Sequence, residues 1–238
     1  MKKLVLLRHG ESQWNLENRF TGWTNVDLTK KGEKEARSAG IILKQEGFKF
    51  DVVYTSVLKR ANRTMDLCLN EMGLDNIQVN YSWRLNERHY GALTGLNKIE
   101  TKEKLGEEQF NQYRRSWDKP PPILEKGSKY SSHNDSLYKE LKNIPDTESL
   151  KNTYDRVIPY FEKNIQEHLK KDKNIIISAH GNSLRALCKY LFNISDKKIN
   201  ELEIPTGNPL IIFFDKNLKI EKSYYLDKER EKKIISNQ

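Results

Sequence analysis

Strand-like and helix-like segments alternate along most of this 238-residue chain, and that order constrains its fold more than any other feature. Short apolar runs predict strands at 3–7, 51–55, 77–81, 174–178, 210–214 and 220–225. Apolar residues spaced by three and four predict helices at 29–46, 58–73, 147–165 and 184–191. This alternation favours an α/β fold, with a mostly parallel central sheet flanked by helices on both faces.

The segment 87–146 interrupts the alternation. It contains short helical pieces, three prolines at 120–122 and a polar stretch at 126–138. We interpret the residues from about 98 to 146 as an insertion that caps one end of the sheet, within a single domain spanning 1–238. The charged stretch 227–238 is expected to form a flexible tail.

Composition excludes several classes of protein. The net charge is +9, but the lysines are scattered and no nucleic-acid-binding motif occurs, so we favour a solvated surface and expect no nucleic-acid partner. The longest apolar runs hold about four residues, whereas a membrane-spanning helix needs about 20, so no membrane partner is expected. Two cysteines, Cys68 and Cys188, exclude a disulfide scaffold and fit a reducing cytoplasm; both fall on apolar helix faces, where core packing is expected.

Polar residues suited to chemistry follow several of the predicted strands. The first strand runs into Arg8 and His9, the second leads to Arg60, the third leads to Glu87, and the isoleucine-rich strand runs into His180. In open α/β sheets, ligands bind beyond the carboxyl ends of the strands. We therefore expect these five side chains to meet at one edge of the sheet.

This set of residue types fits phosphoryl transfer without a metal. A neutral histidine can attack phosphorus, arginines can hold the phosphoryl oxygens, and a glutamate can move the proton of the attacking or leaving oxygen. A zinc site is the weaker alternative, because arginines accompany both histidines and no metal-ligand spacing occurs. No glycine-rich nucleotide loop is found either.

The remaining histidines have simpler explanations. His133 lies in the polar part of the insertion and His168 near a predicted helix end, so both are expected to be surface or structural residues. His89 is close to Glu87, and the sequence leaves its role open between structure and the edge of a substrate site.

Several longer stretches carry a family resemblance. They are 6–15 (LLRHGESQWN), 20–23 (FTGW), 86–98 (NERHYGALTGLNK) and 179–185 (AHGNSLR), with shorter matches at 114–116, 120–122, 148–150 and 204–207. Together they resemble the histidine phosphatase superfamily, in its branch of cofactor-dependent phosphoglycerate mutases. The resemblance covers nearly the whole chain.

The resemblance implies a role for each motif residue. His9 would be the nucleophile, Arg8 and Arg60 would clamp the phosphoryl group, Glu87 would be the general acid and base, and His180 would stabilise charge. The implied substrate-binding residues are Arg8, His9, Gly10, Glu11, Ser12, Gln13, Trp14, Asn15, Thr21, Gly22, Arg60, Glu87, Arg88, His89, Tyr90, Lys98, Arg114, Arg115, Gly181 and Asn182.

The implied reaction interconverts 3-phosphoglycerate and 2-phosphoglycerate in glycolysis and gluconeogenesis. It would need 2,3-bisphosphoglycerate as primer, no metal, and a lid that keeps water from phosphohistidine. The candidates for this lid are the insertion 98–146 and the tail after residue 226. The resemblance also implies a cytoplasmic homo-oligomer, with a dimer favoured. Three alternatives stay open: a histidine phosphatase for another phosphoester, a non-catalytic binding module, and a basic nucleic-acid binder.

Overall fold

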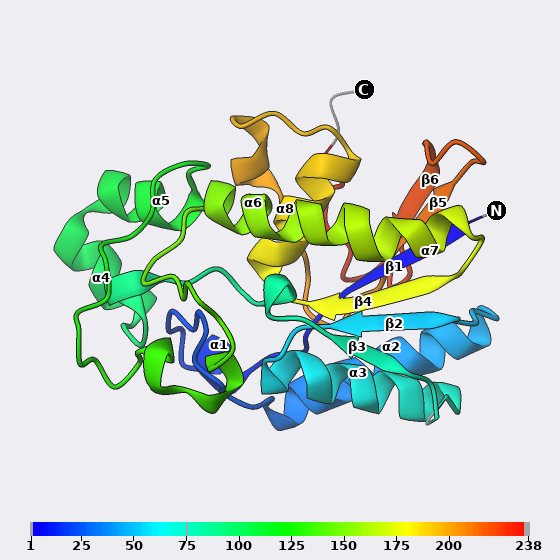
Figure 1. Ribbon diagram of the computed structural model, residues 1–238, viewed down its shortest axis with the longest axis horizontal. Helices are drawn as coiled ribbons and strands as arrows, with labels where there is room; N and C mark the ends of the chain where they lie inside the picture. Colours follow the sequence, from blue (N-terminus) through cyan, green and yellow to red (C-terminus); the bar gives the residue numbers. More distant parts are fainter. Residues whose placement is uncertain (1, 75, 236–238) are drawn as a thin grey trace.

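The computed structural model describes residues 2–74 and 76–235, and its centre is one six-stranded sheet (Figure 1). The strands lie in the order β3-β2-β4-β1-β5-β6. Their bounds are β1 (Lys2–Arg8), β2 (Val52–Thr55), β3 (Val79–Tyr81), β4 (Ile175–Ala179), β5 (Leu210–Phe214) and β6 (Ile220–Tyr225). Strands β1 to β4 pair in parallel, and β5 is antiparallel to β1 and β6. The predicted mostly parallel sheet is confirmed.

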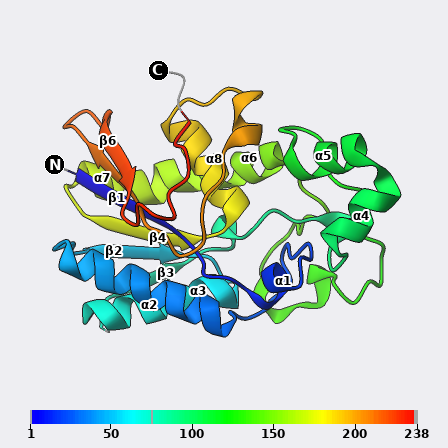
Figure 2. The same cartoon turned by 180° about the vertical axis from the view of Figure 1, so that it is seen from behind.

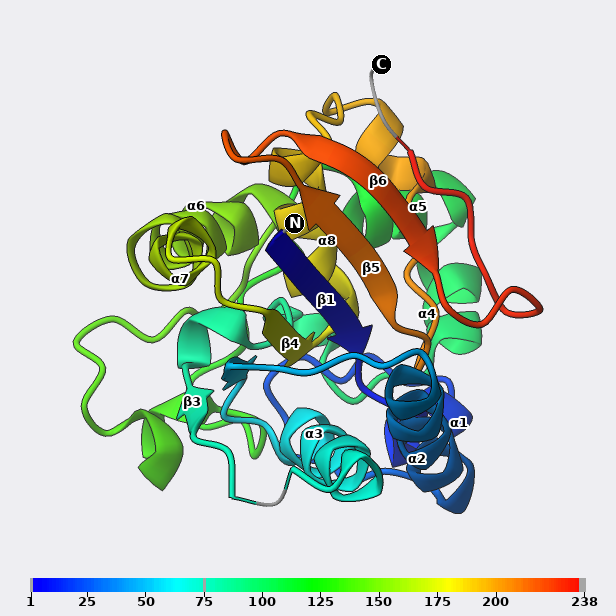
Figure 3. The ribbon, with the colours of Figure 1, turned by 90° about the vertical axis from the view of Figure 1, so that its right-hand side faces the viewer.

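Helices cover both faces of the sheet, as expected. Leu4 and Leu6 of β1 pack in the core cluster that includes α6 (Leu150–Tyr160) and α8 (Gly181–Leu191). Val5 and Leu7 point the other way and pack with α2 (Lys30–Gln45) and α3 (Lys59–Met72), so β1 is apolar on both faces (Figures 2 and 3). Cys68 and Cys188 lie on opposite sides in these two clusters and are free, which confirms their predicted core packing.

The helix ends follow local capping chemistry. Thr29 caps α2, since its Oγ1 accepts a hydrogen bond from the backbone N–H of Gly32 at 3.0 Å. Gly73 ends α3 with a φ of 74°, a left-handed conformation that glycine adopts without strain. The helix expected from 147 begins three residues later, because Ser149 and not Thr147 is its N-cap.

Two local elements differ from the expected ones. The predicted helix 147–165 is not regular: after α6, which contains Pro159, comes a π-helical turn over Phe161–Ile165 and then α7 (Gln166–Lys170). Proline lacks an N–H for the helical ladder, which accounts for irregularity here. A short helix α1 (Gln13–Leu16), capped by Ser12, was not anticipated.

The insertion lies past the end of the sheet toward which β2 and β4 point (Figure 1). It holds α4 (Lys98–Leu105), α5 (Glu107–Arg115) and 3₁₀ turns at Ser132–Asn134 and Ser136–Tyr138. Two further 3₁₀ turns, Trp83–Leu85 and Gly91–Leu93, precede it, and another, Lys198–Glu201, follows α8. Within the described ranges, no helix has both the length and the apolar character needed to cross a membrane.

Candidate active site

His9 directly follows β1 and is 2% exposed. Its Nδ1 lies 2.7 Å from the carbonyl oxygen of Gly10, and a carbonyl only accepts, so Nδ1 carries the hydrogen. Burial, followed by the charges of Arg60 and Arg8, holds the pKa of His9 well below its usual value of 6.5. The ring is therefore neutral at pH 7 and keeps a lone pair on Nε2.

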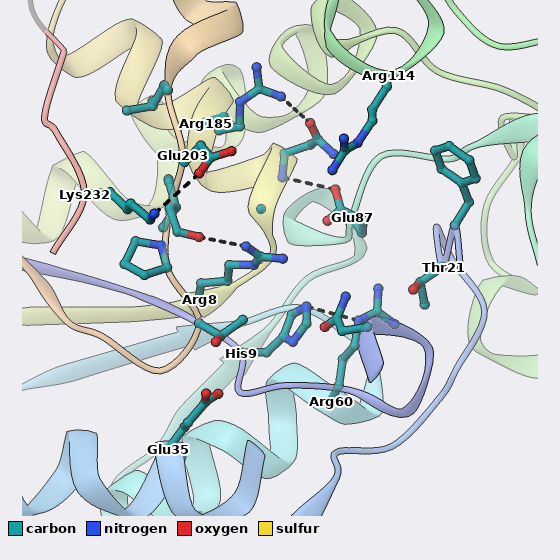
Figure 4. Close-up of a pocket in the computed structure, with 18 of the residues that line it drawn as sticks. Arg8, His9, Thr21, Glu35, Arg60, Glu87, Arg114, Arg185, Glu203 and Lys232 are labelled. Atoms are coloured by element: carbon teal, nitrogen blue, oxygen red, sulfur yellow. Dashed lines mark hydrogen bonds and ion pairs between the residues drawn. The ribbon is translucent and has the colours of Figure 1, made fainter. Parts of the chain in front are cut away.

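Arg60, near the start of α3, fixes the geometry around that lone pair. Its Nε lies 3.3 Å from His9 Nε2 (Figure 4). Its Nη1 and Nη2 donate to the carbonyl oxygens of Thr24 and Gly22 at 2.9 and 2.8 Å. Burial lowers the pKa of Arg60 to about 10, so the guanidinium stays charged at neutral pH. Arg8 donates to the carbonyl of Ile204 at 2.7 Å, while its buried Nε has no partner among the described residues.

His180 lies between β4 and α8, with its ring centroid 5.0 Å from that of His9. Its Nε2 is 2.8 Å from Ser56 Oγ, which itself accepts from the N–H of Leu58. The other ring nitrogen, Nδ1, is buried and has no hydrogen-bond partner in the described part of the chain. Burial and the charge of Arg60 keep the pKa of His180 well below 6.5. The two neutral imidazoles thus lie side by side at this edge of the sheet.

Glu87 is the carboxylate predicted for this edge of the sheet. It is 8% exposed, and its Oε1 accepts from the backbone N–H groups of Arg88 at 2.8 Å and Asn182 at 3.1 Å. Those two bonds occupy one carboxylate oxygen and leave Oε2 for a substrate proton. The predicted convergence of Arg8, His9, Arg60, Glu87 and His180 at one edge of the sheet is what the structure has.

A cavity of about 580 Å³ opens in front of these groups, and its lining is strongly basic (Figure 4). Predicted site residues that line it are Arg8, His9, Asn15, Thr21, Arg60, Glu87, Tyr90, Lys98, Arg114, Arg115, Gly181 and Asn182. Burial, together with the charges of Arg114 and Arg8, lowers the pKa of Lys98. Cations that disfavour one another in this way favour an anionic ligand.

The other predicted residues do not line the cavity. They are Gly10, Glu11, Ser12, Gln13, Trp14, Gly22, Arg88, His89 and His180. Gly10 makes room for the backbone of Gly32, with which a Cβ would overlap. The buried side chain of Arg88 donates to the carbonyls of Tyr113 and Arg114 at the end of α5. His89 Nδ1 accepts from the N–H of Gly91 at 3.0 Å, which is a structural contact.

Several lining residues were not predicted as part of the site. They are Arg19, Phe20, Lys31, Glu35, Arg185, the run 202–206 and the tail residues 229–232. Glu203 lies 3.8 Å from Lys232 (Figure 4) and accepts a hydrogen bond from Arg115 at 3.0 Å. The insertion, the loop after α8 and the tail therefore meet at this carboxylate. Arg185 stands in the motif 179–185, whereas the tail carries no motif that points to a site.

The two histidines expected outside the site have other partners. His133 Nε2 lies 2.8 Å from Asp146, and His168 Nδ1 lies 2.7 Å from the hydroxyl of Tyr54. In the described part of the chain, no three His, Cys, Asp or Glu side chains gather into a set that could hold a metal.

Comparison with known proteins identifies the family. The family model of histidine phosphatase superfamily branch 1 matches residues 4–142 and 129–224. The chain belongs to the histidine phosphatase superfamily. It is also 54% identical, over 230 residues and 97% of both chains, to the 2,3-bisphosphoglycerate-dependent phosphoglycerate mutase of Caulobacter sp. (strain K31).

Several solved structures share the fold at low identity. A mycobacterial glucosyl-3-phosphoglycerate phosphatase has a TM-score of 0.72 at 19% identity, over 94% of this chain and 97% of that one. YhfR of Bacillus stearothermophilus has a TM-score of 0.70 at 22% identity, over 93% and 95%. These likenesses support the architecture described above and do not bear on substrate.

Proposed function

We propose that this protein is a 2,3-bisphosphoglycerate-dependent phosphoglycerate mutase, an isomerase that interconverts 3-phosphoglycerate and 2-phosphoglycerate. The observation that carries the proposal is His9: a buried, neutral imidazole with Nδ1 held by a carbonyl and Nε2 facing Arg60 in a basic cavity. The 54% identity to a mutase over nearly the full length supports the choice of substrate.

The residues divide the chemistry among them. Phosphorylated His9 transfers its phosphoryl group from Nε2 to a substrate hydroxyl, and Glu87 takes the proton of that hydroxyl. His9 then takes back the phosphoryl group of the neighbouring carbon, and Glu87 returns the proton to the oxygen that leaves. Arg8 and Arg60 stabilise the phosphoryl oxygens during both transfers, and His180 packs beside His9 and supports this site. Each cycle restores the phosphohistidine and moves the phosphate by one carbon.

The cavity fits a small ligand with several negative charges. Phosphoglycerates carry a phosphate and a carboxylate, and arginine binds both groups through two parallel hydrogen bonds. Arg114, Arg115 and Lys98 line the part of the cavity contributed by the insertion, and the buried Nε of Arg8 lacks a partner within residues 2–74 and 76–235. The same residues would hold 2,3-bisphosphoglycerate, which supplies the phosphoryl group that primes His9.

The insertion and the tail would keep water from the phosphohistidine. Hydrolysis of this intermediate would turn a mutase into a phosphatase, so exclusion of water decides the balance of activities. Tail residues 229–232 and helix α5 both contribute to the lining. A working lid, a cytoplasmic location and a homodimer remain predictions of this proposal.

The test is conversion of 3-phosphoglycerate to 2-phosphoglycerate with EDTA present, with and without a trace of 2,3-bisphosphoglycerate. We expect turnover that resists EDTA, rises with the bisphosphate and is lost in His9→Ala. Release of free phosphate without 2-phosphoglycerate would favour the phosphatase alternative. Absence of any turnover in folded protein would favour a binding module.

A further inference from the structure

Arg156 of α6 lies outside the cavity lining and forms the most extensively bonded ion pair near the site. Its Nε and Nη2 lie 2.6 and 2.9 Å from the two carboxylate oxygens of Glu148. The two side chains are 9% and 4% exposed. A two-point arginine–carboxylate pair at this burial holds the guanidinium in one orientation.

The same guanidinium also donates hydrogen bonds to the backbone that leads to Glu87. Nη1 donates to the carbonyl of Arg84 at 2.7 Å, and Nη2 is 3.1 Å from that of Asn86 and 2.9 Å from that of Glu87. The indole Nε1–H of buried Trp23 donates to the carbonyl of Glu87 as well, at 2.6 Å. Two donors from distant parts of the chain thus converge on one oxygen.

Glu148, the partner of Arg156, bonds to the backbone on the C-terminal side of Glu87. Its Oε2 accepts from the backbone N–H of His89 at 2.8 Å, and its own N–H donates to the carbonyl of His89 at 2.9 Å. Within residues 83–89 the one regular element is a 3₁₀ turn at Trp83–Leu85, and Glu87 itself belongs to no helix or strand. The position of its carboxylate therefore depends on side-chain bonds to its backbone more than on regular secondary structure.

We propose that Arg156 is a positioning residue for the proton transfer made by Glu87. A general acid must lie within hydrogen-bond distance of the oxygen that it protonates, and a displacement of about 1 Å lowers a rate on the order of 100-fold. Arg156 touches neither the cavity nor the reacting atoms, so its removal acts on turnover and not on substrate binding. This inference rests on the proposed mutase function.

The first variant is Arg156→Lys, which keeps the charge beside Glu148 but lacks the planar fork that reaches several carbonyls. We expect kcat to fall by about 30-fold to 100-fold while KM stays within about threefold. Arg63→Lys is the matched control, because Arg63 pairs with Glu33 on the exposed surface of α3 and is 44% exposed. It should leave both constants unchanged. A rise in KM without a fall in kcat for Arg156→Lys would overturn the proposal.

A double-mutant cycle separates positioning from general support of the fold. In a Glu87→Gln background no proton transfer by Glu87 remains to be lost, so Arg156→Lys should lower kcat less than about threefold further. If the fold losses in kcat of the two substitutions instead multiplied, Arg156 would act through the stability of the whole fold, and the proposal would be refuted. Trp23→Phe removes the indole donor while it keeps an aromatic ring at this position, and serves if the lysine variant does not fold; the same non-additivity is expected. Lack of turnover in the wild type would instead refute the proposed function.

Discussion

Three buried imidazoles should make this protein lose stability as the pH falls below neutrality. His9, His89 and His180 are at most 2% exposed, and burial lowers the pKa of each, that of His89 to about 4. The unfolded chain takes up protons on these residues near pH 6.5, while the folded chain does not. The unfolded state thus binds more protons below pH 6.5, and the free energy of unfolding decreases there.

The size of the effect follows from the linkage relation. Each pH unit in this window is worth about 1 kcal/mol or slightly more for each imidazole that stays neutral in the folded state. Between pH 7.0 and 5.5 the three together should lower the free energy of unfolding by about 3 to 4 kcal/mol. This stability is fully present above the unfolded pKa, and its loss begins as the pH falls through that value.

Urea denaturation at pH 7.0, 6.5, 6.0 and 5.5 measures this directly, with linear extrapolation at each pH. His89→Gln should reduce the decrease by about 1 kcal/mol, because it removes one of the three buried imidazoles. His133→Gln is the control, since His133 is half-exposed and its replacement leaves those three in place. A total decrease below about 1 kcal/mol in the wild type would refute the reasoning, because the imidazoles would then titrate like exposed ones.

Two substitutions test other parts of the structure. Gly10→Ala should lower stability by about 1 to 3 kcal/mol, measured by urea denaturation, because its Cβ would overlap the backbone of Gly32. Gly181→Ala, whose Cβ would make only ordinary contacts, should not lower stability; equal losses would contradict this argument. Glu203→Gln should lower KM for phosphoglycerate by about two- to fivefold in steady-state kinetics, since it frees Arg115 from an internal carboxylate. A raised KM would show that Glu203 helps to hold the site.

Sequence patterns predicted the parts of the site that depend on strand ends. His9 and His180 follow buried strands, so their meeting at one edge follows from parallel pairing of β1 and β4. The structure gives the motif residue Gly10 a packing reason as well, since its Cα lies against the backbone of Gly32, and a motif match alone does not separate substrate contact from close packing. The sequence pattern also predicted that a helix starts at 147. Both Thr147 and Ser149 are suitable N-cap residues, and Ser149 is the N-cap of α6.

The tail was a candidate for the lid, but which of its residues line the cavity could not be predicted, because that depends on how the tertiary fold brings distant parts of the chain together. Tail residue Lys232 reaches the cavity only because β5 and β6 bring the chain back beside β1. Arg156 bonds mainly to backbone carbonyls, and carbonyls are the same for every residue type. A sequence pattern therefore carries no signal for such a contact.

The most direct test of the account is to find the phosphoryl group on His9. The protein is incubated with 2,3-bisphosphoglycerate carrying ³²P, and digested under alkaline conditions that preserve phosphohistidine. The account predicts label on the peptide that contains His9, stable to base and labile to acid, and discharged when 3-phosphoglycerate is added. Label on another residue, or turnover of 3-phosphoglycerate to 2-phosphoglycerate in His9→Ala, would contradict it.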